Sequence, residues 1–463
     1  DVVMKIDLLS LRNFRCFEEI EIPLHENLTV IVAQNGIGKT TILDALRIML
    51  WPYVRAFNTK NQKDPGNSIS KSDVTIYNHE HYASFGLPSI IQVEGDFGEV
   101  NSWSRFRNEQ NILKEDKNTV KINNYAKKIN SQLSSKNEVN LDLPVLGYYG
   151  TGRLWSFKKN MSHLTEKKSS SKILANDKRI GYINCLDPAS SYRLCEKWIR
   201  SIFMSYQMDI SAYIQRYKTL PMEIESESED VIRLVQSSLN IILEDTNYRE
   251  LQLFVNPVTD DFDLGMVDIK RNIILPIDQL SDGIRNAISL VLDIIYRCVK
   301  INPHLGDQAN LASGIILIDE VDMHLHPQWQ QTILDQLRKV FVNLQFIVTT
   351  HSPQVLTTVE PECIRAIYLN PENNRYEYKI PDFSKGAESI QVLEDIFNVR
   401  SRPPQIEEVQ LLREYEELVE IDEWDSERAI EIRKILDQWG KNRDTVLDKL
   451  DTRISLKRFK RSR

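Results

Sequence analysis

The sequence predicts an α/β fold, and three short, largely apolar runs carry that prediction. They span residues 30–33, 314–318 and 344–349, and each ends in polar or charged residues. Runs without regular polar alternation are typical of strands buried on both faces of a sheet. Ile42, Leu46 and Met49 follow the first run at helical spacing, and buried strands that alternate with amphipathic helices indicate the α/β class.

The same patterns predict the remaining elements in order. Apolar or alternating segments indicate strands, large apolar residues at helical spacing indicate helices, and segments rich in Asn, Lys and Ser indicate loops. The predicted strands are 5–11, 19–22, 89–97 and 144–150, with a hairpin over 251–277. The predicted helical segments are 189–246 and 405–455, whereas 108–141 is expected to be helical only in part.

The first apolar run leads into a phosphate-binding loop. The sequence Ala33-Gln34-Asn35-Gly36-Ile37-Gly38-Lys39-Thr40 matches Gly-x-x-x-x-Gly-Lys-[Ser/Thr], except that Ala33 replaces the first glycine. The glycines let backbone N–H groups surround the β- and γ-phosphates, the lysine adds a charge, and the threonine hydroxyl can bind Mg²⁺. We therefore expect a nucleoside triphosphate and Mg²⁺ to bind here, through Asn35, Gly36, Ile37, Gly38, Lys39, Thr40 and Thr41.

The other two runs end in residues suited to phosphoryl chemistry. Asp319 and Glu320 follow 314–318, where Asp319 would hold Mg²⁺ through its coordination shell and Glu320 would polarise the attacking water. The alternative is an ordinary buried strand with a solvated acidic end. His351 follows 344–350 and would stabilise the γ-phosphate, although a lone histidine there can also be a structural cap.

A fourth motif opens a long apolar helical pattern. Leu280-Ser281-Asp282-Gly283 precedes apolar residues that include Ile288 and Val291. Serine and glycine at a helix N-terminus can bind an anion, whereas a simple N-capping turn is the alternative. The position of this motif, ahead of Asp319 and Glu320 in the sequence, favours the interpretation as an anion-binding site.

This order of motifs resembles the ABC-type ATPases of the RecF/SMC/OLD group. Residues 280–283 match the Leu-Ser-x-Gly signature, 11–17 resemble the Leu-x-Asn-Phe-Arg-x-Phe opening, and 319–327 match Asp-Glu-x-x-x-His-Leu-His-Pro. The resemblance implies an ABC-type P-loop NTPase head with a β-subdomain, a helical insertion and a C-terminal helical tail. It also implies ATP and Mg²⁺ as cofactors, nucleotide binding by Arg15, and self-association as a head-to-head dimer or higher oligomer. In such a dimer Ser281 and Gly283 of one copy cap the γ-phosphate held by the other.

The domain organisation follows from the motifs and from changes in composition. We expect the ATPase head over 4–400, divided into lobe I (4–157), a helical insertion (158–250) and lobe II (251–400). Residues 401–463 would form a helical oligomerisation or partner region, with a solvated cap on the head as the alternative. The basic end, 457–463, could contact nucleic acid or form a disordered tail.

Two assignments stay open. The glutamine that helps to hold Mg²⁺ in these ATPases could be Gln92, or the loop 148–155 could take its place. His324 and His326 could be read as a metal pair, but with no third ligand nearby we place them in a dimer-contact loop.

The resemblance can be narrowed. Sustained heptads are missing between Thr41 and Leu280, which excludes long coiled-coil arms. No Asp-x-Asp ends an apolar strand after His351, so we expect the chain to have no nuclease motif of its own. The remaining resemblance is to PtuA ATPases of Septu and retron-linked Septu anti-phage systems, through 386–397 and the break at 402–404. It implies a PtuB-like HNH nuclease partner, a reverse transcriptase and its DNA product in retron systems, and DNA binding through the complex.

Composition sets the remaining limits. The net charge of −8 argues against a broadly basic nucleic-acid coat. Five scattered cysteines, without a signal peptide or a long apolar run, favour a cytoplasmic location and no membrane partner. Two alternative functions stay open, a RecF-like DNA-binding repair ATPase and a nucleotide-sensing scaffold with little turnover.

Overall fold

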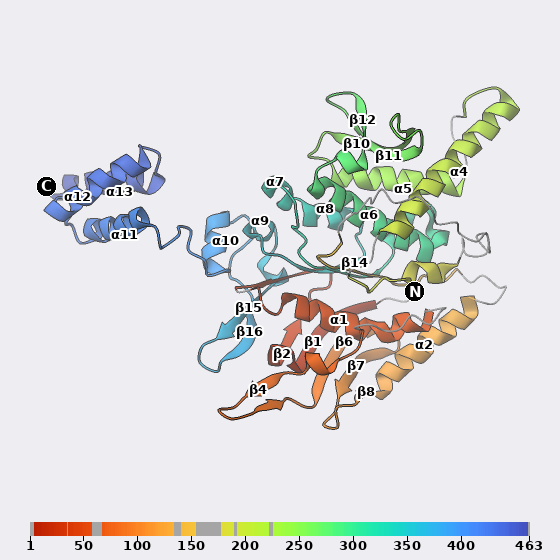
Figure 1. The fold of residues 1–463 in the computed structure, drawn as a ribbon, viewed down its shortest axis with the longest axis horizontal. Helices are drawn as coiled ribbons and strands as arrows, with labels where there is room; N and C mark the ends of the chain where they lie inside the picture. The colour runs from red at the N-terminus through yellow and green to blue at the C-terminus, as the bar shows by residue number, and fades with distance from the viewer. Residues whose placement is uncertain are drawn as a thin grey trace. The chain divides into compact units, whose positions relative to one another are not determined.

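The computed structural model describes residues 4–34, 36–57, 67–133, 140–153, 177–188, 192–221 and 226–461. The chain divides into two compact units, Asp1–Val392 and Leu393–Arg463, each with its own packing (Figure 1). The predicted loop residue Asn35 lies outside the described residues. The predicted lobe and insertion boundaries within the head stay predictions.

A six-stranded sheet forms the centre of the first unit (Figure 1). Its strands, in spatial order, are β16 (Arg375–Lys379), β15 (Ile364–Asn370), β3 (Leu28–Ala33), β14 (Leu344–Thr349), β13 (Gly314–Ile318) and β9 (Val145–Tyr149). Neighbours run parallel except for β15 and β16. Strands β3, β13 and β14 are buried along their whole length, as the apolar runs predict. The predicted α/β class is confirmed.

Helix α1 (Lys39–Val54) lies between the central sheet and a second, antiparallel sheet. It contacts β3 and β14 of the first and β6 of the second, and all of its 16 residues except Thr40 and Arg47 are buried. The antiparallel sheet has the order β2 (Phe17–Pro23), β1 (Met4–Phe14), β6 (Ser89–Phe97), β7 (Val100–Arg107) and β8 (Leu113–Glu115). A short hairpin pairs β4 (Ile76–Asn78) with β5 (Ala83–Phe85).

The expectation that only part of 108–141 is helical is confirmed. Residues Lys117–Leu133 form one continuous helix, α2, which packs against β7 and α1. Its buried residues lie at helical spacing and are Thr119, Ile122, Asn123, Ala126 and Ile129. The lysines of α2 occupy its exposed face, whereas the buried Asn123 donates to the Pro52 carbonyl at 2.8 Å.

A group of helices covers the opposite side of the central sheet from α1 (Figure 1). Helix α5 contacts α4, α6 and α8, and α6 packs on β9. The helices are α4 (Arg193–Tyr217), α5 (Glu227–Ile242), α6 (Asp282–Ile301), α7 (Pro327–Gln330), α8 (Ile333–Val340) and α9 (Pro353–Leu356). The predicted hairpin is present and gains a third strand, in the order β10 (Tyr248–Val255), β11 (Phe262–Asp268) and β12 (Ile273–Pro276).

The second unit begins within α10 (Ser389–Asp395) and has a hydrophobic core of its own. Its helices are α11 (Glu407–Glu420), α12 (Glu427–Gly440) and α13 (Thr445–Arg461). The core contains residues from all three helices, including Leu412, Ile432, Leu436, Leu450 and Ile454. The expected helices over 405–455 are therefore present.

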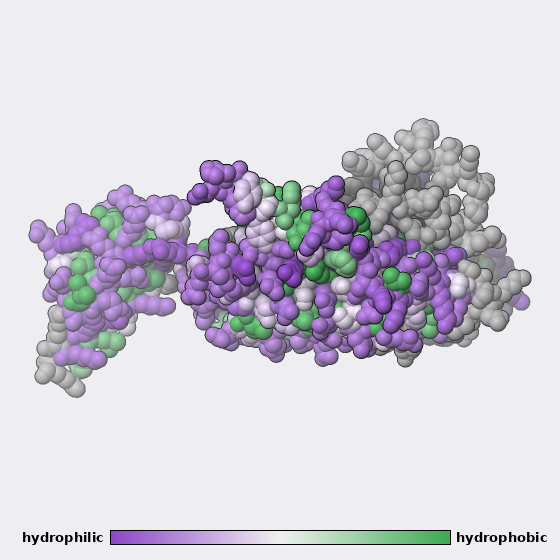
Figure 2. Space-filling view, turned by 90° about the horizontal axis from the view of Figure 1, so that it is seen from below, coloured by the Kyte–Doolittle hydropathy of each residue, from purple (hydrophilic) through white to green (hydrophobic). Residues whose placement is uncertain are grey.

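The face of the molecule seen in Figure 2 is mostly hydrophilic, with small apolar patches.

Among the helices of the described ranges, none is long and apolar enough to cross a membrane.

Truncation of Ile432 should destabilise the second unit. Ile432 is fully buried in its core, so Ile432→Ala is expected to cost about 2–5 kcal/mol. Hydrogen–deuterium exchange of peptides within 407–461 measures the effect locally. Ile435→Ala removes the same atoms from a residue that is 41% exposed on the same helix, and it should cost less than about 0.5 kcal/mol. Equal exchange in the two variants would contradict the assigned core.

Candidate active site

The carboxyl ends of four parallel strands meet at one edge of the central sheet. The register pairs Ile318 with Val348 and with Tyr149, and Thr349 with Ile31. Segments that follow these strands are therefore brought together although they are far apart in the sequence. In open α/β sheets this edge is where ligands bind.

The phosphate-binding loop joins β3 to α1 at this edge. Gly36 and Gly38 have φ values of 70° and 93°, a left-handed conformation that favours glycine. A Cβ on Gly38 would lie 2.7 Å from Cζ of Phe17, and one on Gly36 would lie 3.3 Å from Cε1 of His351. Gly38 is the N-cap of α1 and provides no side-chain cap. The first N–H groups of α1 can therefore face an anion.

The loop and the end of β13 are joined by a direct hydrogen bond. The Thr40 hydroxyl donates to Oδ2 of Asp319 at 2.9 Å, and the Thr349 hydroxyl donates to Oδ1 of Asp319 at 2.5 Å. A hydroxyl and a fixed carboxylate are hard oxygen ligands of the kind that Mg²⁺ prefers. Thr40 and Asp319 thus fit the Mg²⁺ that the sequence predicts.

Lys39 is a buried cation at the centre of the site. Only 2% of it is exposed, and its Nζ donates to the Thr350 carbonyl at 3.4 Å. Burial lowers the pKa of Lys39 to about 8, and the charges of Glu320, Asp319 and Asp322 act against that shift. An anionic phosphate beside Nζ would favour the charged form.

Glu320 and His351 lie side by side at the exposed rim. Nε2 of His351 is 3.6 Å from Oε1 of Glu320, and the two side chains are 49% and 37% exposed. His351 also lies against Gly36 of the loop. A carboxylate that solvent can reach, next to the phosphate loop, is placed to accept a proton from water.

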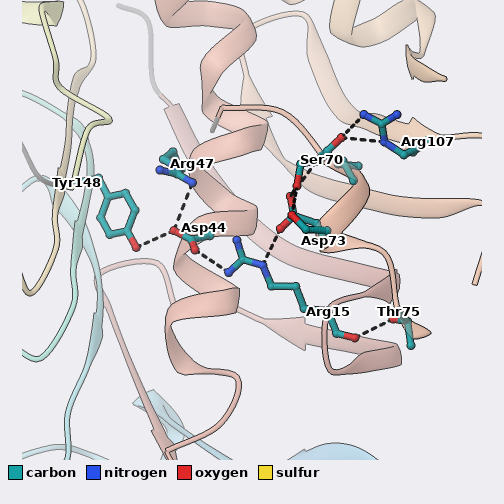
Figure 3. Close-up of polar contacts among 10 residues, drawn as sticks. Arg15, Asp44, Arg47, Ser70, Asp73, Thr75, Arg107 and Tyr148 are labelled. Atoms are coloured by element: carbon teal, nitrogen blue, oxygen red, sulfur yellow. Dashed lines mark hydrogen bonds and ion pairs between the residues drawn. The ribbon is translucent and has the colours of Figure 1, made fainter. Parts of the chain in front are cut away.

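Arg15 is held by two carboxylates (Figure 3). Its Nη1 donates to Asp44 at 2.7 Å and its Nε donates to Asp73 at 2.9 Å. Asp44 lies on α1 and also accepts from the Tyr148 hydroxyl at 3.0 Å. These bonds connect the β1–β2 turn to α1 and β9, so Arg15 supports the position of α1. Direct contact of Arg15 with a nucleotide stays a prediction.

The two candidate positions for the Mg²⁺-binding glutamine lie in different sheets. Gln92 is on β6 in the antiparallel sheet and donates to the Ser102 hydroxyl at 3.2 Å. The described part of the other candidate, 148–153, follows β9 and lies beside the end of β13. The loop after β9 is therefore the one at the edge that holds Asp319.

Arg153, in that loop, is the residue that sequence reasoning missed. Its guanidinium donates to the carbonyl oxygens of Asp319 and Glu320, at 2.5 and 2.6 Å. A Gly-Thr-Gly-Arg segment directly after a buried strand was the available signal.

The predicted signature loop begins α6. Ser281 is the N-cap of α6, is exposed, and provides no side-chain cap to the described helix. Gly283 packs closely on the loop after β13, where a Cβ would lie 2.4 Å from the carbonyl oxygen of His324. Ser281 thus occupies the N-cap position without a side-chain capping bond, and the anion-binding role of this loop stays a prediction.

The histidines of the β13–α8 connection have separate roles in the fold. His324 has a positive φ of 63°, and His326 accepts from the N–H of Gln328 as the N-cap of α7. Within the described ranges, no group of three or more His, Cys, Asp or Glu residues could hold a metal ion.

The fold and the site define a phosphate-binding-loop ATPase. Residues 4–356 match the AAA ATPase domain family, and the chain belongs to that family. The chain is 27% identical to the retron Ec83 probable ATPase of Escherichia coli, over 96% of this chain and 86% of that one. It is also 28% identical to the Septu protein PtuA of Bacillus thuringiensis, over 35% and 41%. The SMC head domain from Thermotoga maritima aligns with a TM-score of 0.42 and 11% identity, over 82% of this chain and all of that one.

The predicted resemblance to the RecF/SMC/OLD group, close to PtuA, is confirmed by the family match and by the retron and Septu relatives. The roles of the individual site residues remain predictions.

ATP affinity should fall as the pH rises through 8. Burial lowers the pKa of Lys39 to about 8, so the lysine is mostly charged at pH 7 and mostly neutral at pH 9. If only the charged form binds phosphate, the Kd for ATP should rise about tenfold over this interval. Calorimetry at several pH values, in buffers of different ionisation enthalpy, measures both the Kd and the proton uptake.

The matched control is Lys39→Arg, because a guanidinium stays charged over this range. Its affinity should be independent of pH, whatever its absolute value. Wild-type affinity that is constant from pH 7 to pH 9 would contradict the shifted pKa.

Proposed function

We propose that this chain binds and hydrolyses ATP as the ATPase subunit of a bacterial anti-phage defence complex. The observation that carries the ATPase part is the Thr40–Asp319 hydrogen bond, which joins the phosphate loop to the end of β13. Glu320 and His351 lie beside that contact. The family match and the names of the retron and Septu relatives support the defence part.

The proposed reaction is attack of water on the γ-phosphate. Lys39 and the N–H groups at the start of α1 bind the phosphates, and bound Mg²⁺, held by Thr40 and Asp319, would neutralise developing charge. Glu320 accepts a proton from the attacking water, and His351 donates a hydrogen bond to a γ-phosphate oxygen. The products are ADP and inorganic phosphate.

We propose that a second copy completes the site. The exposed Ser281 and the N-terminus of α6 form an anion-binding surface that is not used for capping within the chain. Ser281 and Gly283 of one copy would then contact the γ-phosphate bound by the other. Closure of the two heads would require ATP, so hydrolysis would open them.

The partner of this cycle is proposed to be a PtuB-like HNH nuclease, whose activity the head closure controls in the cytoplasm. In a retron system the complex would also hold a reverse transcriptase and its DNA product. A RecF-like repair ATPase would act without such a nuclease, and a nucleotide-sensing scaffold would bind ATP with little turnover. Co-purification with an adjacent HNH gene product and an ATPase assay separate these alternatives.

Glu320→Gln should remove turnover but keep ATP binding. The amide has nearly the same shape but cannot accept the proton, so kcat should fall by about 100-fold or more. Paired assays of ATP turnover and of phage plaque formation test the variant together with its nuclease partner. The control Glu362→Gln changes a carboxylate outside the site. Unchanged turnover and unchanged protection in Glu320→Gln would sink the proposed mechanism.

The second unit is proposed to carry a partner or self-association surface. It folds around its own core, and deletion of 405–463 removes its helices α11–α13. We expect the truncated head to bind ATP but to elute alone in size-exclusion chromatography with the nuclease. Complex formation by the truncated head would exclude this surface.

A further inference from the structure

Arg153 is buried beneath the edge of the sheet that carries the site, and its guanidinium donates hydrogen bonds to main-chain oxygens. It is 4% exposed, and its Nη1 donates to the carbonyls of Gly150 at 2.9 Å and Asp319 at 2.5 Å. Its Nη2 donates to the carbonyl of Glu320 at 2.6 Å. One guanidinium thus joins the turn after β9 to the turn after β13.

Glu320 has an unusual backbone that needs such support. Its φ is 49°, a left-handed conformation that a side chain with a Cβ adopts at a cost. Both of its peptide groups are held: its N–H donates to the Thr349 hydroxyl at 2.8 Å, and its carbonyl accepts from Arg153 and from the N–H of Met323 at 3.0 Å. Arg153 is thus one of three groups that fix the backbone from which the Glu320 carboxylate extends.

The same edge is hydrogen-bonded to α6. The N–H of Asp319 donates to the Tyr149 carbonyl at 2.8 Å, and the Tyr149 hydroxyl donates to Oδ2 of Asp293 at 2.7 Å. Asp293 lies on α6 and also accepts from Nε of Arg297 at 3.0 Å. Helix α6 is the helix that begins at Ser281, so the proposed γ-phosphate cap and Asp293 belong to one rigid element.

These groups surround a common small cavity and are removed from solvent. Tyr149, Asp293 and Arg297 are each no more than 5% exposed. The cavity is lined by Tyr148, Tyr149, Arg153, Asn184, Pro188, Tyr192, Asp293 and Arg297. Burial raises the pKa of Tyr149 well above its usual value, so its hydroxyl stays a donor to Asp293. Hydrogen bonds in such a low-dielectric setting are strong and directional.

We infer that Arg153 is a positioning residue for Glu320, and that Tyr149 and Asp293 couple this support to α6. A displacement of α6 when a second copy binds its N-terminus would pass through Asp293 and Tyr149 to the backbone of Asp319. Arg153 would then fix the peptide of Glu320 in the orientation that activates water. This inference rests on the proposed ATPase function and extends it to residues outside the nucleotide motifs.

The test measures kcat and the Kd for ATP separately, on the whole chain together with its proposed nuclease partner. Arg153→Lys keeps a cation but replaces the planar fork with a single point of donation, and Tyr149→Phe removes only the bond to Asp293. Both should lower kcat, by about 10- to 100-fold for Arg153→Lys, with the Kd for ATP changed less than about twofold. Tyr182→Phe is the control, because it loses a buried hydroxyl that donates to the Pro144 carbonyl outside this chain of bonds.

The outcomes are distinct. Lower kcat with retained ATP affinity in Arg153→Lys and Tyr149→Phe, but not in Tyr182→Phe, supports the inference. A wild-type kcat in both variants overturns the inference and leaves the ATPase proposal standing. An equal loss of kcat in all three variants has the same consequence, because that loss reflects stability alone. A wild-type protein that binds ATP without turnover overturns the ATPase proposal and this inference together. If Arg153→Lys does not fold, Tyr149→Phe decides.

Discussion

The Thr40–Asp319 hydrogen bond depends on the whole architecture of the first unit. Thr40 and Asp319 are far apart in the sequence, and they meet because β3 and β13 run parallel on either side of β14. A parallel arrangement places all the carboxyl ends at one edge. The burial of these strands keeps that register fixed, since a slip of one residue would turn apolar side chains toward polar surroundings. The chemistry of the site is thus a consequence of sheet order.

Charge balance is the second constraint on the site. Lys39 carries a positive charge in a buried position, which costs free energy, and the carboxylates of Asp319, Glu320 and Asp322 recover part of that cost. The helix N-terminus of α1 adds further positive potential without a side-chain cap. The site therefore has its basic groups on the loop and the start of α1 and its acidic groups in the turn after β13, and a phosphate with a divalent cation would satisfy both.

Local motifs made the central residues predictable. Each central residue comes shortly after the end of a largely apolar strand, and the structure brings these strand ends to one edge of the sheet. These residues are Lys39, Thr40, Asp319, Glu320 and His351. The contacts of Arg153 and of Arg15 could not be read in this way. The Arg153 guanidinium binds main-chain carbonyls, which every residue has, so no particular residue type in the sequence marks its partners. The partner of Arg15 is Asp73, which lies in a loop that packs there from another part of the chain.

The burial of α1 between two sheets has a mechanical consequence. A helix that touches close-packed neighbours on nearly every side cannot slide or rotate by itself, because interiors at native density transmit strain instead of absorbing it. The helix and the two sheets that it touches therefore form one stiff body, so a displacement of the loop would be passed to both sheets together.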